Sequence, residues 1–211
     1  MPLLFHHQSP DGGTIAGWGL TEPSEELLQW VTLTAADMEL LQAFRIEKRR
    51  REWLASRLLV KTVTGIDPVI SYLPNGKPYL QKPHQHISIS HTNDLAVVVL
   101  HPDHQVAVDV EMITPRVTKV ADRFLHASEV AMIPLDDALL WQTLIWCAKE
   151  ALFKYYGQQA IDFKQHFRVM PFIPTPDCPF KIAAYFDKND NKSELTLMAQ
   201  YTQTWAMVYL L

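Results

Sequence analysis

Alternating apolar and polar residues predict short strands in two parts of the chain. In the first part the expected strands are VISY, HISIS, LAVVVL and AVDVEMI, at residues 69–72, 86–90, 95–100 and 107–113. After Phe167 the alternation returns, and the expected strands are FKIAAYF, SELTLMAQY and WAMVYLL, at residues 180–186, 193–201 and 205–211. The Pro-Asn-Gly sequence after VISY and the polar segments 101–105 and 187–192 predict turns.

Helical patterns occupy much of the remaining chain. Thr34 is expected to cap a helix that begins with AADMELL. A second helix is expected from about residue 46 to residue 64, and Gly65 suits the position just past its end. The longest pattern starts near Asp136 and reaches the segment before Gly157. The mixture of strands and helices predicts an α+β protein.

Composition limits the class of protein further. The 211 residues suffice for one large domain or two small ones, and 48% hydrophobic with 20% charged residues is ordinary for a globular protein. The formal net charge of −4 argues against a nucleic-acid binder by bulk charge. Cys147 and Cys178 match no metal spacing and make no disulfide framework, which favours the reducing cytoplasm. The N-terminal segment is not of signal-peptide type, and the apolar run at 95–100 is too short to span a membrane.

Two pairs of charged residues are candidates for chemistry. Asp109 and Glu111 lie on the same face of a predicted strand, which is either solvated or faces a hard divalent cation such as Mg²⁺. Such an ion typically takes one or two protein carboxylates together with substrate phosphates. Glu150 and Lys154 stand four residues apart on the longest helix, in line with Trp146. They form either an exposed ion pair or the edge of a cleft, because a Trp is usually at least partly buried.

Three other segments carry side chains that suit phosphate groups. Ser90 and His91 are neighbours in a predicted strand and point to opposite faces, so they cannot pair as nucleophile and base. His91 is then either structural or a phosphate contact. Lys77 precedes Pro78 in a rigid turn, where a lysine either serves the turn alone or meets a phosphate as a point charge. The basic stretch at 45–61 is either a solvated helix face or a surface for a phosphate or an acidic partner.

The order of these segments resembles the motif series of the surfactin-type (Sfp-type) 4′-phosphopantetheinyl transferases. Members of that family typically have a Gly-Lys-Pro turn, a segment ending in Ser-His-Ser or Ser-His-Thr, a strand with Asp-x-Glu, and a helix with Trp-x-x-Lys-Glu-Ala-x-x-Lys. This chain has NGKP, ISISHT, VAVDVE and IWCAKEALFK in the same order, within residues 75–154. Two departures, Cys147 for a frequent Thr or Ser and Ala107 for a usual Gly, do not touch the chemistry.

The resemblance implies a reaction and a fold. Family members move the 4′-phosphopantetheine arm of coenzyme A to a serine hydroxyl of an apo acyl or peptidyl carrier protein and release 3′,5′-ADP. The reaction depends on Mg²⁺, with Mn²⁺ as an alternative ion. The implied fold has two similar α/β halves related by pseudo-twofold symmetry, with the site between them. We expect the halves at residues 1–104 and 105–211, in a monomer with no nucleic-acid or membrane partner.

By the same resemblance, Asp109, Glu111 and Glu150 bind the divalent ion, which bridges them to the pyrophosphate of coenzyme A. Lys154 is expected to neutralise or protonate the leaving phosphate. Glu129, in the segment RFLHASE, matches the family's proposed general base for the carrier serine, although some members use a metal-bound water.

The resemblance also assigns contacts with coenzyme A. Four residues in the turn and strand motifs match such positions: Lys77, Pro78, Ser90 and His91. His91 is counted among the catalytic residues as well, since its position contacts phosphates or the nucleotide. Basic side chains in the equivalent of residues 45–61 hold the 3′-phosphate, and Arg51 and Lys48 are the candidates here.

The sequence also allows two functions from other classes, a binding module and a catalytically inactive scaffold. A module that binds RNA or an acidic protein would explain the basic stretch and predicts steep salt dependence, but leaves Asp109, Glu111 and Glu150 without a purpose. A catalytically dead scaffold is the other, yet every expected catalytic position is filled. Fatty-acid, polyketide and nonribosomal-peptide carriers all fit, because carrier choice depends on surfaces that no motif records.

Overall fold

The chain folds into two compact units. The computed structural model describes residues 3–157, 160–176, 178–188 and 191–211. One unit comprises Met1–Val106 with Leu211, and the other comprises Ala107–Leu210. Each contains antiparallel sheet and helices, which confirms the predicted α+β class. The pseudo-twofold relation between the halves stays a prediction.

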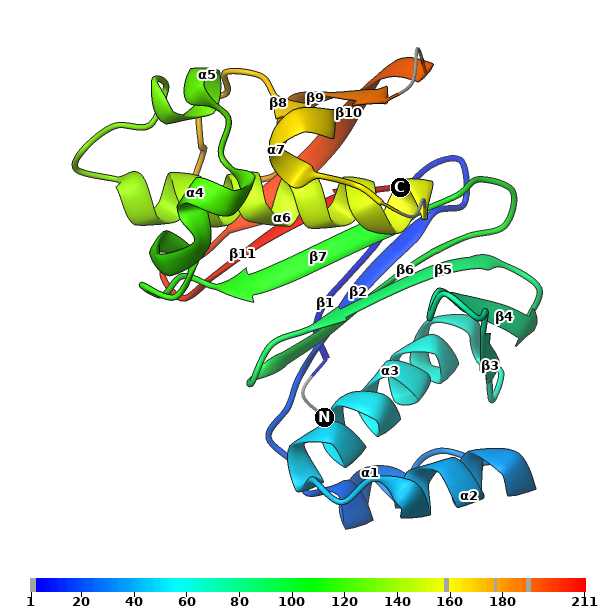
Figure 1. The fold of residues 1–211 in the computed structure, drawn as a ribbon. Helices are drawn as coiled ribbons and strands as arrows, with labels where there is room; N and C mark the ends of the chain where they lie inside the picture. The colour runs from blue at the N-terminus through cyan, green and yellow to red at the C-terminus, as the bar shows by residue number, and fades with distance from the viewer. Residues whose placement is uncertain (1–2, 158–159, 177, 189–190) are drawn as a thin grey trace. The chain divides into compact units, whose positions relative to one another are not determined.

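The first unit is built on a four-stranded antiparallel sheet. Across this sheet the strands are β1 (Leu3–Gln8), β2 (Thr14–Gly19), β6 (Leu95–His101) and β5 (His86–His91). A small separate sheet pairs β3 (Val69–Tyr72) with β4 (Pro78–Lys82). The helices, drawn with these strands in Figure 1, are α1 (Ser24–Gln29), α2 (Ala35–Ala43) and α3 (Glu47–Thr64).

Local sequence signals set the limits of the helices in this unit. The hydroxyl oxygen of Thr34 accepts a hydrogen bond from the backbone N–H of Asp37, so the predicted cap of α2 is confirmed. Gly65 ends α3 in the left-handed conformation, with a φ of 72°, as its position predicted. The helix contacts β2 and β6 and buries Leu54 and Leu58 in the core of the unit.

The second unit is built on a five-stranded antiparallel sheet. Across it the strands are β7 (Ala107–Met112), β11 (Trp205–Leu210), β10 (Asn191–Tyr201), β9 (Phe180–Lys188) and β8 (Phe167–Val169). Its helical segments are η1 (Val117–Val120), α4 (Ala121–Phe124), α5 (Ala127–Val130), α6 (Ala138–Tyr156) and α7 (Phe163–His166). In Figure 1 the long helix α6 lies along one face of this sheet.

Helix α6 carries the predicted helical pattern and ends at Gly157, which has a φ of 60°. It contacts β7 and β11 and buries Leu144, Ala148 and Leu152 completely. This packing fixes the side of α6 that faces the strand of Asp109, and it thereby positions the candidate site of this unit.

Strand β7 pairs with a strand from the far end of the sequence. The segment 101–105 joins β6 to β7, as predicted, while β7 pairs with β11, and Asp109 lies opposite Val208. The segment therefore connects two different sheets. The predicted turn at 187–192 includes residues 189–190, which lie outside the described residues. In the part of the chain that the structure describes, no helix is both long and apolar enough to cross a bilayer.

Candidate functional site

Acidic and basic side chains meet where β7 packs on α6. The Nζ of Lys154 donates a hydrogen bond to Oδ1 of Asp109 over 2.8 Å and a second to the backbone oxygen of Val108 over 2.9 Å. Asp109 is buried, whereas Lys154 keeps part of its side chain exposed. Of the two alternatives for Lys154, an exposed pair with Glu150 or the edge of a cleft, neither includes this ion pair from helix to strand.

Glu150 lies one helical turn before Lys154 and belongs to the same cluster. The pKa of Glu150 is raised to about 7, first by burial and then by the charge of Asp109 and, to a smaller extent, that of Glu111, while the ammonium of Lys154 lowers it. Three carboxylates therefore lie near enough to repel one another. The neighbouring thiol of Cys147 has its pKa raised, first by burial and then by the charges of Asp109 and Glu111, which favours its protonated form.

The donor chemistry of this cluster fits Mg²⁺, since that ion prefers carboxylate oxygens. Within the described residues, however, no group of three or more His, Cys, Asp or Glu side chains is arranged to hold a metal ion. Oδ1 of Asp109 accepts from Lys154 instead. An ion bound through this oxygen would have to replace the ammonium of Lys154.

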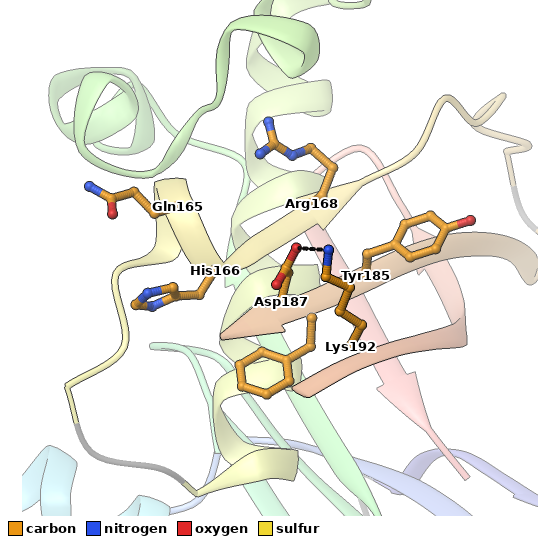
Figure 2. Close-up of a pocket in the computed structure, with 7 residues that line it drawn as sticks. Gln165, His166, Arg168, Tyr185, Asp187 and Lys192 are labelled. Atoms are coloured by element: carbon orange, nitrogen blue, oxygen red, sulfur yellow. Dashed lines mark ion pairs between the residues drawn. The ribbon is translucent and has the colours of Figure 1, made fainter. Parts of the chain in front are cut away.

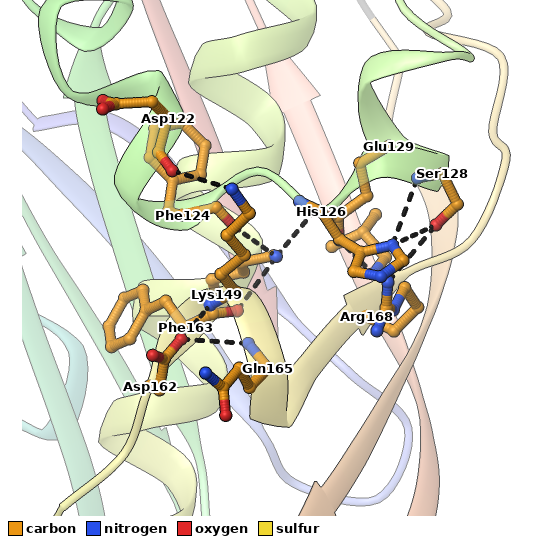
Figure 3. A network of polar contacts seen from close by, with 12 residues as sticks. Asp122, Phe124, His126, Ser128, Glu129, Lys149, Asp162, Phe163, Gln165 and Arg168 are labelled. Atoms are coloured by element: carbon orange, nitrogen blue, oxygen red, sulfur yellow. Dashed lines mark hydrogen bonds and ion pairs between the residues drawn. The ribbon is translucent and has the colours of Figure 1, made fainter.

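Glu129 lies elsewhere in the second unit, in the polar network of Figure 3. Its carboxylate accepts hydrogen bonds from Nζ of Lys149 over 2.7 Å, from the backbone N–H of His126 over 2.7 Å and from that of Val169 over 2.8 Å. The side chains of both Glu129 and Lys149 are 0% exposed. Lys149 also donates to the backbone oxygens of Phe124 and Phe163.

This network gives Glu129 a structural role that the sequence did not reveal. The ammonium of Lys149 joins α5 to the ends of α4 and the start of α7, and Glu129 closes a capping box with His126. Burial is the larger influence on the pKa of Glu129 and raises it, while Lys149 lowers it. The role of Glu129 as general base stays a prediction.

In the first unit, several predicted residues surround one cavity of about 150 Å³. Helix α3 contributes Arg49, Glu52, Trp53 and Ser56, and the strands and turn contribute Tyr72, Gly76, Pro78, Ile89 and His91. The predicted contacts Pro78 and His91 are therefore brought together. Ser90 points to the opposite face of β5 from His91.

Among the basic side chains, Arg49 lines this cavity, and Lys48 and Arg51 do not. The Nζ of Lys48 lies 3.6 Å from the carboxylate of Glu52 and also bonds Asn93. Sequence reasoning missed Arg49 and Glu52. Arg49 stands three residues before Glu52 and four before Trp53, which places the three on one side of the helix. Since a tryptophan is usually at least partly buried, that spacing is the signal that could have found them.

Lys77 lines a different cavity, of about 330 Å³, next to β4 and β5. Burial lowers the pKa of its ammonium. Pro78 lines both cavities. The turn itself is held by Gly76, whose φ is 83° and whose N–H donates to the oxygen of Leu73.

The basic stretch is not a continuous basic face. Arg57 is buried, bonds Asp37 over 2.8 Å and lies over the ring of Trp53. Lys61 pairs with Asp67 over 2.8 Å. This internal pairing weakens the interpretation of the stretch as an RNA-binding surface.

Figure 2 shows a third cavity, of about 250 Å³, which holds none of the predicted site residues. It is lined by Gln165, His166, Arg168, Tyr185, Phe186, Asp187 and Lys192. An exposed ion pair of 3.2 Å joins Asp187 and Lys192 at its rim.

Comparison with known proteins identifies the family. A family model described as the 4′-phosphopantetheinyl transferase superfamily matches residues 105–209, which include the whole carboxylate and lysine cluster. The chain belongs to this superfamily. The family predicted from the four motifs is thereby confirmed.

Curated members of the 4′-phosphopantetheinyl transferase superfamily are similar to part of this chain. The 4′-phosphopantetheinyl transferase AcpT of Escherichia coli K12 is 32% identical over 119 residues, which is 53% of this chain and 60% of that protein. AcpT of Salmonella typhimurium is 31% identical over 120 residues, 53% of this chain and 62% of that protein. A phosphopantetheinyl transferase of Thraustochytrium is 27% identical over 131 residues, 57% of this chain and 45% of that protein. Each match thus spans less than two thirds of the relative's length.

Proposed function

We propose that this protein transfers the 4′-phosphopantetheine arm of coenzyme A to a serine hydroxyl of an apo acyl or peptidyl carrier protein, releasing 3′,5′-ADP. The observation that carries the proposal is the cluster of Asp109, Glu111, Glu150 and Lys154, which lies within the segment matched by the superfamily. We further propose that the protein acts as a monomer in the cytoplasm.

In this proposal Asp109, Glu111 and Glu150 hold a Mg²⁺ ion, with Mn²⁺ as an alternative. The bound ion would neutralise charge on the phosphate oxygens of coenzyme A and polarise the phosphate under attack. Lys154 leaves Asp109 and neutralises the charge that develops on the leaving phosphate. The ammonium is suited to both positions, because it is a point charge with three donors on a flexible stem.

The first unit supplies contacts with coenzyme A. The cavity that holds Arg49, Pro78 and His91 offers cationic donors beside the rings of Tyr72 and Trp53. A nucleotide carries the complementary groups, which are phosphates and a flat base. Lys77, Ser90, Lys48 and Arg51 remain candidates for further contacts with this co-substrate.

The experiment is transfer of the arm, measured by intact-mass spectrometry. The full chain, mixed with Mg²⁺, coenzyme A and an apo acyl or apo peptidyl carrier protein, is expected to add one phosphopantetheine arm to the carrier. A chelator in place of Mg²⁺ should abolish the gain. No mass gain on any of several apo carriers, with a known transferase working alongside, would reject the proposal.

A pair of variants makes the assignment specific. Asp109→Ala is expected to abolish transfer, and raising coenzyme A should not restore it, because both the ion and its placement are lost. Asp187→Ala is the matched control, since its carboxylate lies in the same unit but is exposed and forms an ion pair with Lys192. It should retain full activity. Near wild-type kcat in Asp109→Ala would reject the metal site.

A further inference from the structure

A buried carboxylate, Glu52, lies at the centre of the cations beside the cavity of the first unit. Its side chain is 5% exposed, whereas those of Lys48 and Arg49 are 53% and 49% exposed. The distances from its oxygens are 3.6 Å to Nζ of Lys48, 3.7 Å to a guanidinium nitrogen of Arg49 and 3.3 Å to Nδ1 of His91. The carboxylate of Glu52 therefore contacts three side chains, Lys48 and Arg49 from α3 and His91 from β5.

These contacts leave the cations able to bind another anion. Distances of 3.3 to 3.7 Å are longer than a strong charged hydrogen bond, so the donors are oriented by Glu52 without being tightly bound to it. Lys48 and Arg49 carry two permanent positive charges against the single charge of Glu52. The cluster thus keeps an excess positive charge on its exposed side.

Glu52 also sets the orientation of the imidazole of His91. A guanidinium of Arg49 lies 3.1 Å from Nε2 of His91, and a guanidinium can only donate. Nε2 must then accept, which leaves the proton of the neutral ring on Nδ1, the nitrogen that faces Glu52. The chain from Glu52 through His91 to Arg49 fixes both the ring and the guanidinium at the wall of the cavity.

We propose that Glu52 is a positioning residue for the nucleotide phosphate of the co-substrate, acting through Arg49 and His91 and through Lys48. The inference rests on the proposed function for the identity of the ligand. Long cationic side chains lose rotamer freedom when they bind, and a buried carboxylate that orients them beforehand lowers that cost. Glu52 lies behind the cations, so they screen its own repulsion of the incoming phosphate.

The test is binding of 3′,5′-ADP to the full chain, measured by calorimetry without metal or carrier. Glu52→Gln keeps the shape of the side chain and removes its charge. It is expected to raise the Kd for 3′,5′-ADP by about 10-fold or more. In transfer assays it should raise KM for coenzyme A while kcat and KM for the carrier stay nearly unchanged, since a remote phosphate contact is similar in the ground and transition states.

Glu47→Gln is the matched control on the same helix. The carboxylate of Glu47 bonds the backbone N–H and the hydroxyl of Ser24 rather than the cations, so its loss should lower the melting temperature and leave the Kd within about twofold. In an Arg49→Met, His91→Ala background, Glu52→Gln should change the Kd by less than about twofold, because its main intermediaries are gone.

The outcomes separate this inference from the proposed function. Unchanged or tighter binding in Glu52→Gln, or a wild-type protein that does not bind 3′,5′-ADP, would overturn the positioning role. An equal loss in Glu47→Gln would also overturn it, since the effect would then be general destabilisation. A protein that binds 3′,5′-ADP as expected but transfers nothing would reject the proposed function and leave the role of Glu52 in anion binding standing.

Discussion

Lys149→Met tests the buried network of the second unit most directly. The substitution keeps the apolar stem of the side chain and removes only the ammonium. In the wild type this ammonium meets Glu129 and the backbone oxygens of Phe124 and Phe163 at 2.7, 2.7 and 3.0 Å. The variant leaves a carboxylate that is 0% exposed without its counter-charge, together with two carbonyls that lose a donor.

The expected loss of stability is large. Removing one partner of a buried ion pair costs about 3–5 kcal/mol, and an orphaned buried acceptor costs about 1–3 kcal/mol. These contributions share one site and do not add fully, so we expect a total of about 4–6 kcal/mol. At roughly 2–4 °C per kcal/mol for a chain of this length, the melting temperature should fall by about 8–24 °C.

Urea unfolding followed by tryptophan fluorescence measures the effect, because Trp146 packs edge-on against Phe124 in the same region, with ring centroids 5.0 Å apart. Lys192→Met is the matched control. Its ammonium is 71% exposed, so the change should stay within about 0.5 kcal/mol. The double variant Glu129→Gln, Lys149→Met should lose less than the sum of the single losses, since no buried charge is then left unpaired. A Lys149→Met protein as stable as the wild type would refute the reasoning.

Two further substitutions probe the other charge pairs. Lys154→Met should lower kcat by roughly 10²-fold or more in the mass-spectrometric transfer assay. The same substitution should lower the free energy of unfolding in urea by about 1–3 kcal/mol, because Lys154 bonds the buried Asp109. If both stability and kcat were unchanged, Lys154 would be an ordinary solvated surface residue. Arg57→Met should cost about 3–5 kcal/mol by leaving the carboxylate of Asp37 buried without its partner, and a loss below about 1 kcal/mol would contradict the pairing.

Local signals made the start of α2 and the end of α3 predictable from the sequence, whereas α1 and α7 were not predicted. The cap at Thr34 and the left-handed Gly65 act within a few residues, so both positions follow from composition and spacing alone. Strands β1 and β2 escaped prediction. Every residue of β2 is buried and two of its six residues are glycine, so the strand shows no alternation of apolar and polar positions.

Pairing between distant segments was the harder problem. The alternation in residues 107–112 identified a strand, but its pairing with β11 depends on a segment about a hundred positions later. The same limit applies to charge. The motifs pointed to Asp109, Glu150 and Lys154, whereas the burial of Lys149 depends on the meeting of several helices that no short motif records.

Both candidate sites contain a buried charge with a partner of opposite sign from within the chain. Lys154 neutralises Asp109 in the second unit, and Glu52 lies beside the guanidinium of Arg49 in the first. The ammonium of Lys154 occupies the position proposed for the metal cation, and the carboxylate of Glu52 lies close to the position proposed for the phosphate. Burying a bare charge is costly, so a site built from like charges needs such a counter-charge to fold before its ligand arrives.

The two counter-charges are not equivalent, and their difference bears on mechanism. Lys154 contacts Asp109 at 2.8 Å, a full charged hydrogen bond, so a cation that binds there must displace it and set it free for another partner. Glu52 lies 3.6 Å from the ammonium of Lys48 and 3.7 Å from the guanidinium of Arg49 and is buried, so an arriving phosphate can use their remaining donors without displacing it. The lysine is therefore placed to change partners during a reaction, and the glutamate is placed to stay. This contrast predicts that Lys154→Met acts mainly on kcat and Glu52→Gln mainly on KM for coenzyme A.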